Sequence, residues 1–262
     1  MLIALHQLAA ALYLAAGVSG GMALASPGAR ARRASLVLLG VGALLHLSSF
    51  AFLHRAQPTP ALTDLPAAAS LMACLAMLAY LAFARRARWD ALVVWVAPVG
   101  FLGAFVGALR LPHAVGADLF GSGSWPHAHV LLASAGLALL GVAGVAGLAF
   151  LRESSQLKHK RRVGARLPSL ETLDRVNVVA LAVGFPLLTL GVLTGMLWLE
   201  GSHGSPWSGS AHEIWTTFAW GIYGVLVLAR FAARQSARNA ALSAVGGFAF
   251  LLFAVIGVGI VA

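Results

Sequence analysis

The hydropathy pattern of this chain repeats one unit, an apolar run of roughly 20 residues followed by a short polar connection. A helix of that length matches the thickness of a bilayer's hydrocarbon core. Eight such spans can be drawn, at residues 2–25, 34–53, 66–84, 91–109, 129–151, 176–199, 213–230 and 240–262. A membrane barrel would need short segments of alternating polarity, which the sequence lacks. The pattern therefore predicts an all-α, polytopic transmembrane helix bundle, with residues 1–262 forming one transmembrane domain.

The composition supports a membrane protein, because 60% of the 262 residues are hydrophobic, only 10% are charged, and the mean hydropathy is +0.87. The single cysteine, Cys74, lies within an apolar run, so a disulfide framework and a thiolate metal site are both excluded. The net charge of +10 comes from arginines dispersed over the connections, which indicates membrane topology. We therefore expect the lipid bilayer as the chain's surroundings and no nucleic-acid partner.

The positive charges lie on alternate connections between the predicted spans. Sixteen of the eighteen Lys and Arg residues lie in or beside the odd-numbered connections, and the even-numbered ones hold only Arg55 and Arg110. The positive-inside rule makes the odd-numbered side cytoplasmic, which places both termini outside. No basic residue precedes the first span, so we interpret it as a retained helix and not as a cleaved signal.

The histidines gather on the side predicted to be outer. Seven of the nine lie at or near outer helix ends or in outer connections: His6, His54, His113, His127, His129, His203 and His212. His159 alone is on the inner side. His46 lies within the second span, in its outer half, where an ionisable side chain is a functional candidate by default. The alternative for His46 is a neutral imidazole hydrogen-bonded to a neighbouring helix.

An aromatic segment from Trp198 to Trp220 joins the sixth and seventh spans. It contains four tryptophans, including Trp207 and Trp215, together with His203 and His212, but neither Lys nor Arg. Imidazole beside indole at the mouth of a helix bundle suggests a flat aromatic ligand that carries a metal. The alternative is an aromatic belt at the lipid headgroups with loop histidines in water.

Two histidines begin spans at matching depth on this outer side. His129 shares a helical face with Ala133 and Gly136, and these small residues leave a slot that suits either a planar group or a neighbouring helix. His212 shares a face with Trp215 and Ala219. Two imidazoles at one depth on different helices are suited to bind a haem iron from both sides. Arg110 is placed either to pair with haem carboxylates or to extend its charged end to the interface.

Other site chemistries are not supported by the sequence. The run His212-Glu213-Ile214-Trp215-Thr216 has Thr216 in place of the second histidine of a zinc protease helix. The predicted spans contain no internal carboxylates of the kind that proton or cation transporters usually need.

Several runs resemble the cytochrome c assembly family of CcsA and HemX proteins. They are LPSLETLDRVNVVALAVGFPLLTLGVLTG, AHEIWTTFAWGIYGVLVLAR, HVLLASAGLALLGVAG and LLHLSSF. The resemblance implies a bacterial inner-membrane bundle that binds non-covalent, b-type haem and handles it at the outer face for cytochrome c assembly. It also implies His129 and His212 as axial iron ligands, with Trp207 and Trp215 in the tryptophan-rich outer segment that they flank.

The resemblance leaves the exact role open. The family's larger members have a WDPK core in this segment, which GSPWSGSAHEIW lacks, so the chain is more similar to the HemX or YpjD branch. We expect a haem-handling transport component rather than a stand-alone enzyme, with a partner membrane protein that holds the apocytochrome. The alternatives are a scaffold or regulator that does not itself transfer haem, and a b-type transmembrane electron carrier. The electron carrier would need histidine pairs at both membrane depths.

The charge distribution makes the topology testable. A reporter fused after Arg162 should have a cytoplasmic readout, and one placed at Gly204 should have an extracytoplasmic readout, because the cations follow the positive-inside rule. Paired alkaline phosphatase and fluorescent-protein fusions measure the two compartments. A cytoplasmic Gly204 fusion would contradict an outer histidine site.

Overall fold

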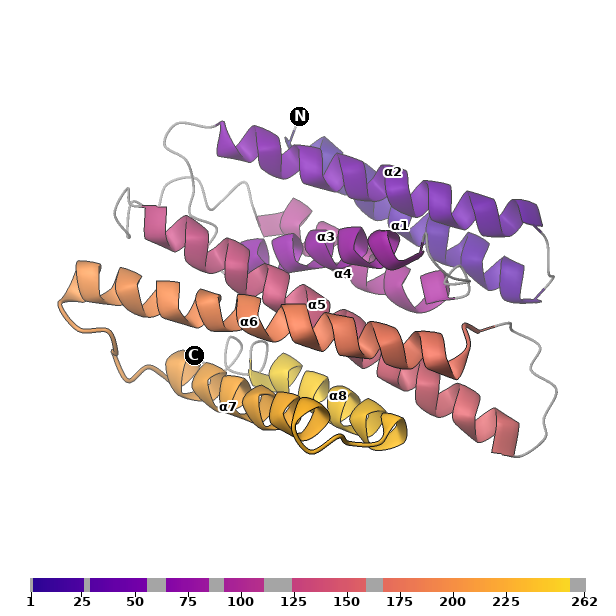
Figure 1. The fold of residues 1–262 in the computed structure, drawn as a ribbon. Coiled ribbons are helices and arrows are strands. Elements are labelled where there is room, and N and C mark those ends of the chain that lie inside the picture. Colours follow the sequence, from indigo (N-terminus) through magenta and orange to yellow (C-terminus); the bar gives the residue numbers. More distant parts are fainter. Residues whose placement is uncertain are drawn as a thin grey trace. The chain divides into compact units, whose positions relative to one another are not determined.

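Apolar runs in lipid must satisfy their backbone hydrogen bonds internally, and the chain does so by forming helices. The computed structural model describes residues 2–25, 29–55, 65–84, 92–110, 124–158 and 167–254 (Figure 1). These residues contain no strand and eight α-helices: α1 Leu2–Ala25, α2 Ala29–His54, α3 Leu65–Ala84, α4 Val93–Arg110, α5 Ser124–Lys158, α6 Leu170–His203, α7 Ala211–Phe231 and α8 Ala237–Leu252. The predicted all-helical bundle is confirmed.

The helices differ in how well they match a membrane's thickness. Among the described residues, α1, α2, α3, α5, α6 and α7 are long and apolar enough to cross a membrane, whereas the apolar part of α4, Val93–Leu109, is shorter. Only 16 residues of α8 are described, so the end of its predicted span lies outside the described part of the chain. Which side of the membrane the termini face stays a prediction.

Helices α5 and α6 are longer than the spans predicted for them. They contain 35 and 34 residues, which corresponds to about 50 Å each at the helical rise. The hydrocarbon core of a bilayer is about 30 Å thick, so both helices extend beyond it. The connection expected from Arg152 to Arg175 is correspondingly shorter, because α5 continues to Lys158 and α6 begins at Leu170.

The chain forms two compact units. The N-terminal unit comprises residues 1–117 and 156–169, with helices α1 to α4, and the C-terminal unit comprises residues 118–155 and 170–262, with most of α5 and helices α6 to α8. The expectation that the two form a single transmembrane domain stays a prediction.

Glycines allow close helix contact in the N-terminal unit. A Cβ added at Gly103 of α4 would lie 2.2 Å from the Ala73 Cβ of α3, and one added at Gly107 would lie 2.4 Å from the Ser70 hydroxyl oxygen. A side chain at Gly103 would force α3 and α4 apart, and one at Gly107 would displace the side chains of Ser70 and His6. The two glycines are four residues apart, a spacing that commonly allows close helix packing in membranes.

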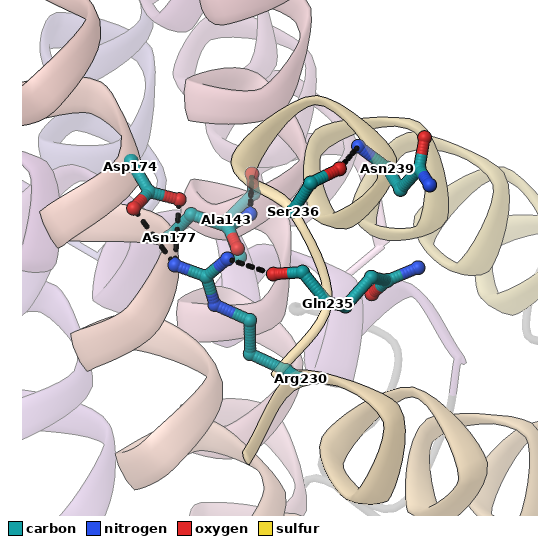
Figure 2. A network of polar contacts seen from close by, with 7 residues as sticks. All are labelled: Ala143, Asp174, Asn177, Arg230, Gln235, Ser236 and Asn239. Carbon is teal, nitrogen blue, oxygen red and sulfur yellow. Dashed lines mark hydrogen bonds and ion pairs between the residues drawn. The ribbon is translucent and has the colours of Figure 1, made fainter. Parts of the chain in front are cut away.

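In the C-terminal unit, polar contacts join the helices at the end opposite the α6–α7 connection (Figure 2). The Arg230 guanidinium of α7 donates two hydrogen bonds of 2.7 Å to the Asp174 carboxylate of α6 and one of 3.0 Å to the Gln235 carbonyl. Nearby, the Asn177 side-chain amide donates to the Ala143 carbonyl at 3.1 Å, which joins α6 to α5. In the sequence, Arg230 was only one of the cations that indicate membrane topology. In the structure it also joins α7 to α6 and to the connection that follows α7.

We expect the substitution Arg230→Ala to destabilise the C-terminal unit. It removes a charge-assisted contact, in which one guanidinium nitrogen donates to both carboxylate oxygens, and leaves the Asp174 carboxylate without this partner, a loss of about 1.5–3 kcal/mol. Thermal unfolding of the purified protein in detergent should therefore begin at a lower temperature. Arg175→Ala is the matched control, because Arg175 is the exposed neighbour of Asp174 on the same helix. Equal effects of the two substitutions would contradict a structural role for the ion pair.

Candidate functional site

The imidazole of His129 lies in the early turns of α5, and its orientation is defined by α6. Its Nδ1 lies 2.7 Å from the carbonyl oxygen of Gly191, and because a carbonyl only accepts, Nδ1 must carry the proton and donate. In the neutral ring this leaves Nε2 as the nitrogen with a lone pair. Histidines that bind metals are typically oriented in this way by a backbone carbonyl at the other nitrogen.

The slot of small residues beside His129 is occupied by α6. A Cβ added at Gly191 would lie 2.7 Å from the Ala133 backbone nitrogen, and one added at Gly136 would lie 2.6 Å from the Leu188 nitrogen. The two backbones are therefore in direct contact along this face. The interpretation of the slot as space for a neighbouring helix is confirmed, and the interpretation as space for a planar group is wrong.

An indole lies next to His129. The ring of Trp198, in the last turns of α6, lies 6.1 Å from the His129 ring between centroids, at an interplanar angle of 37°. The start of α5, the end of α6 and the start of α7 belong to the same end of this unit (Figure 1). His129, Trp198 and the α6–α7 connection thus lie at one end of the C-terminal unit.

The connection between α6 and α7 is ordered by the helix that follows it. The Ser210 hydroxyl caps α7 by accepting from the Glu213 amide at 3.3 Å. The Glu213 carboxylate extends back to accept from the amides of Ser208 and Gly209, at 2.8 and 3.0 Å, and from the Ser208 hydroxyl. The Ser210 half of this arrangement matches a capping box, but the Glu213 carboxylate accepts from the amides of the two residues before the N-cap. Glu213 would be the catalytic glutamate of a zinc protease helix if Thr216 were a histidine. In this structure its carboxylate instead orders the α6–α7 connection.

Trp207 is held by this connection beside α7. The Ser205 hydroxyl donates to the Trp207 carbonyl at 2.8 Å, and Gly204 and Gly209 supply positive φ angles of 72° and 75° on either side. The Trp207 side chain is 44% exposed. Together with one face of α7 it lines an apolar groove of about 690 Å³, whose other residues are Ile214, Thr217, Phe218, Gly221, Ile222, Val225 and Leu226.

Trp215 does not face the groove. Its ring lies 5.7 Å from Phe253 and 6.1 Å from Phe250, so it packs against the end of α8. The expected placement of Trp215 next to a cofactor held by His212 is not tested, because the His212 side chain lies outside the described residues. The Arg110 side chain also lies outside them. By its backbone, His212 is the second residue of α7.

His46 belongs to the N-terminal unit, where it is fully buried within a polar cluster. The Tyr13 hydroxyl lies 3.4 Å from its Nδ1, and the Ser70 hydroxyl lies 3.0 Å from its Nε2. The His6 ring is edge-on to it at 5.0 Å between centroids, and the Phe50 ring stacks on it at 5.5 Å. These contacts match the alternative of an imidazole hydrogen-bonded to neighbouring helices. An iron ligand at His46 would require one of the two hydrogen bonds to break.

The structure adds residues that the sequence did not suggest as site residues. Gly191 supplies the carbonyl that orients His129, and Gly195 leaves room for its ring, since an added Cβ would lie 2.7 Å from Nδ1. A four-residue spacing of glycines is by itself a signal only of close helix packing. The described residues contain no group of three or more His, Cys, Asp and Glu side chains that could hold a metal ion.

Residues 34–262 match the family model described as "Cytochrome C assembly protein", which covers most of the chain. The chain belongs to this family. Among curated relatives, the "Cytochrome c biogenesis protein CcsA" of Thermosynechococcus vestitus is 34% identical over 93 residues, which are 36% of this chain and 29% of the relative. The CcsA of Synechocystis sp. is 31% identical over 122 residues, which are 46% of this chain and 36% of the relative.

A third relative, the CcsA of Prochlorococcus marinus, is 37% identical over 100 residues, which are 36% of this chain and 31% of the relative. The matched segments thus span about a third of the length of these relatives. Membership of the family, eight helices and the apolar spans together support a role in cytochrome c biogenesis at a membrane.

We predict that His46→Ala alters haem loading or haem transfer without abolishing expression, because an ionisable side chain within a membrane span is a functional candidate. Interhelical hydrogen bonds in membranes contribute roughly 0.6 kcal/mol each, so the loss of two leaves the fold intact. The measurements are a pyridine haemochrome assay per mole of purified protein and a cytochrome c maturation assay in cells. Ser70→Ala, which removes one of the two hydrogen bonds, is the matched control. If haem content and maturation are both unchanged in His46→Ala, then His46 is structural only.

Proposed function

We propose that this protein binds b-type haem without a covalent bond and presents it at the outer face of the bacterial inner membrane for cytochrome c assembly. The observation that carries the proposal is the hydrogen bond from His129 Nδ1 to the Gly191 carbonyl. This bond leaves Nε2 as the basic nitrogen, in the tautomer required of an axial iron ligand.

The surroundings of His129 suit a flat, largely apolar ligand. Trp198 lies beside the imidazole, and the same end of the unit carries the connection that holds Trp207. Indole rings offer faces on which an aromatic ligand can stack. Haem would supply the iron that is delivered to an apocytochrome, and His129 and His212, at the start of α7, would hold that iron.

The proposed sidedness rests on the cations of the sequence. His129 and the connection from Gly204 to Ser210 belong to the side with only two cations, so the positive-inside rule assigns them to the outer face. Arg110 is proposed to pair with haem carboxylates on that side. A partner membrane protein would then hold the apocytochrome and receive the haem from this end of the bundle.

The proposal predicts the optical spectrum of ligand variants. The wild-type protein, purified in mild detergent, should show a six-coordinate haem spectrum, and His129→Ala or His212→Ala should yield a five-coordinate or haem-free protein. Imidazole added to the buffer should partly restore the six-coordinate spectrum, because the vacated position accepts a free ligand.

The nearest alternative ligands provide the controls. His127→Ala and His203→Ala should retain the wild-type spectrum, because His127 is two residues from His129 and His203 is on α6. The ligand assignment is wrong if His129→Ala and His212→Ala keep the wild-type spectrum while either control loses it. A wild-type protein without a Soret band would favour the scaffold or regulator over a haem carrier.

A further inference from the structure

We infer that two glycines of α6 select which nitrogen of His129 is presented to a ligand: the Gly191 carbonyl fixes the proton on Nδ1, and Gly195 leaves the space that the ring needs to reach it. Gly191 and Gly195 are therefore positioning residues. The inference concerns the haem-free protein as well, and only its consequence for iron rests on the proposed function.

The atoms closest to Gly195 all belong to the His129 imidazole. A Cβ added there would lie 2.7 Å from His129 Nδ1, 2.9 Å from Cε1 and 3.4 Å from Cγ, and these three ring atoms are the nearest neighbours. Distances below about 3 Å are not tolerated between carbon and these atoms, so the ring would have to move. Because the added carbon lies nearest to Nδ1, the atom that donates to the Gly191 carbonyl, we expect this movement to lengthen or break that hydrogen bond.

A substitution at Gly191 would have a different effect, because the atoms nearest to an added Cβ there are backbone atoms of α5. A Cβ added at Gly191 would lie 2.7 Å from the Ala133 nitrogen and 2.8 Å from the Ala133 Cα, which cannot move without displacing α5. A substitution at Gly191 therefore tests helix packing, whereas one at Gly195 tests the position of the His129 ring. Gly201, in the same helix, has no heavy atom within 4 Å of an added Cβ and tests neither.

The Thr194 hydroxyl is a further donor to the Gly191 carbonyl, beside His129 Nδ1, and it weakens this carbonyl as an acceptor for the imidazole. The Thr194 hydroxyl lies 2.9 Å from the Gly191 carbonyl and 2.8 Å from the Leu190 carbonyl, so its single proton is shared between two acceptors. Removing this hydroxyl leaves the Gly191 carbonyl more available to His129. A stronger hydrogen bond at Nδ1 makes Nε2 a better electron donor to a metal.

The first experiment determines the tautomer in haem-free protein. Nitrogen-15 NMR of histidine-labelled protein, with His129 assigned from a His129→Gln variant, distinguishes a protonated ring nitrogen from an unprotonated one. Wild type and Gly201→Ala should show a protonated Nδ1 and an unprotonated Nε2, whereas Gly195→Ala should lose that preference. A protonated Nε2 in the wild type, or the same tautomer in all three proteins, would overturn the inference.

The second experiment measures haem binding by the same variants. Gly195→Ala should bind haem roughly 10–100-fold more weakly than Gly201→Ala, as expected when the group that orients a metal-binding histidine is lost. Thr194→Val should lower the reduction potential of the bound haem relative to the wild type, because a stronger donor favours ferric iron. Equal affinities for Gly195→Ala and Gly201→Ala would contradict the positioning role while leaving the proposed function intact.

A folding defect is separated from ring displacement by a double variant. In His129→Ala the ring is absent, so adding Gly195→Ala should cause no further loss of thermal stability. If the double variant is less stable than His129→Ala alone, Gly195 serves packing and the positioning role is refuted. If the wild type binds no haem, the proposed function fails, and the NMR experiment still decides the tautomer.

Discussion

Direct backbone contact between α5 and α6 determines the geometry of the C-terminal unit. Lipid provides little hydrophobic driving force between helices, so association depends on close van der Waals packing, which small residues permit. Gly136, Gly191 and Gly195 each approach the other helix so closely that an added Cβ would clash. Because the helices touch, a carbonyl of α6 lies within hydrogen-bonding distance of an imidazole on α5.

The aromatic connection depends on local rather than interhelical interactions. The Ser210 hydroxyl satisfies an amide in the first turn of α7, and the Glu213 carboxylate accepts from the amides of Ser208 and Gly209 and thereby orders the turn that carries Trp207. Trp207 is thereby held beside an apolar face of α7 while Trp215, eight residues later, packs on α8. Two tryptophans of one sequence segment thus have different roles, one lining a groove and one joining helices.

Particular polar side chains join helices in both units. In the N-terminal unit, Tyr13 and Ser70 flank the two nitrogens of His46, and in the C-terminal unit Asp174 pairs with Arg230. An unpaired polar group in a hydrocarbon environment is costly, so such groups join specific helices to one another. This requirement explains why a buried histidine is not by itself evidence of a ligand site.

The sequence alone determined the helical architecture, because an apolar run of span length has one satisfactory backbone structure in lipid. It also identified the family and pointed to His129 as a candidate ligand, since a family motif and an outer helix end are both local features. The structure alone decided what lies opposite each side chain. The small residues beside His129 contact α6, the ring nitrogens of His46 lie next to hydroxyls, and Trp215 faces α8. Such pairings join residues far apart in the chain, and hydropathy describes how apolar a position is but not which helix it meets.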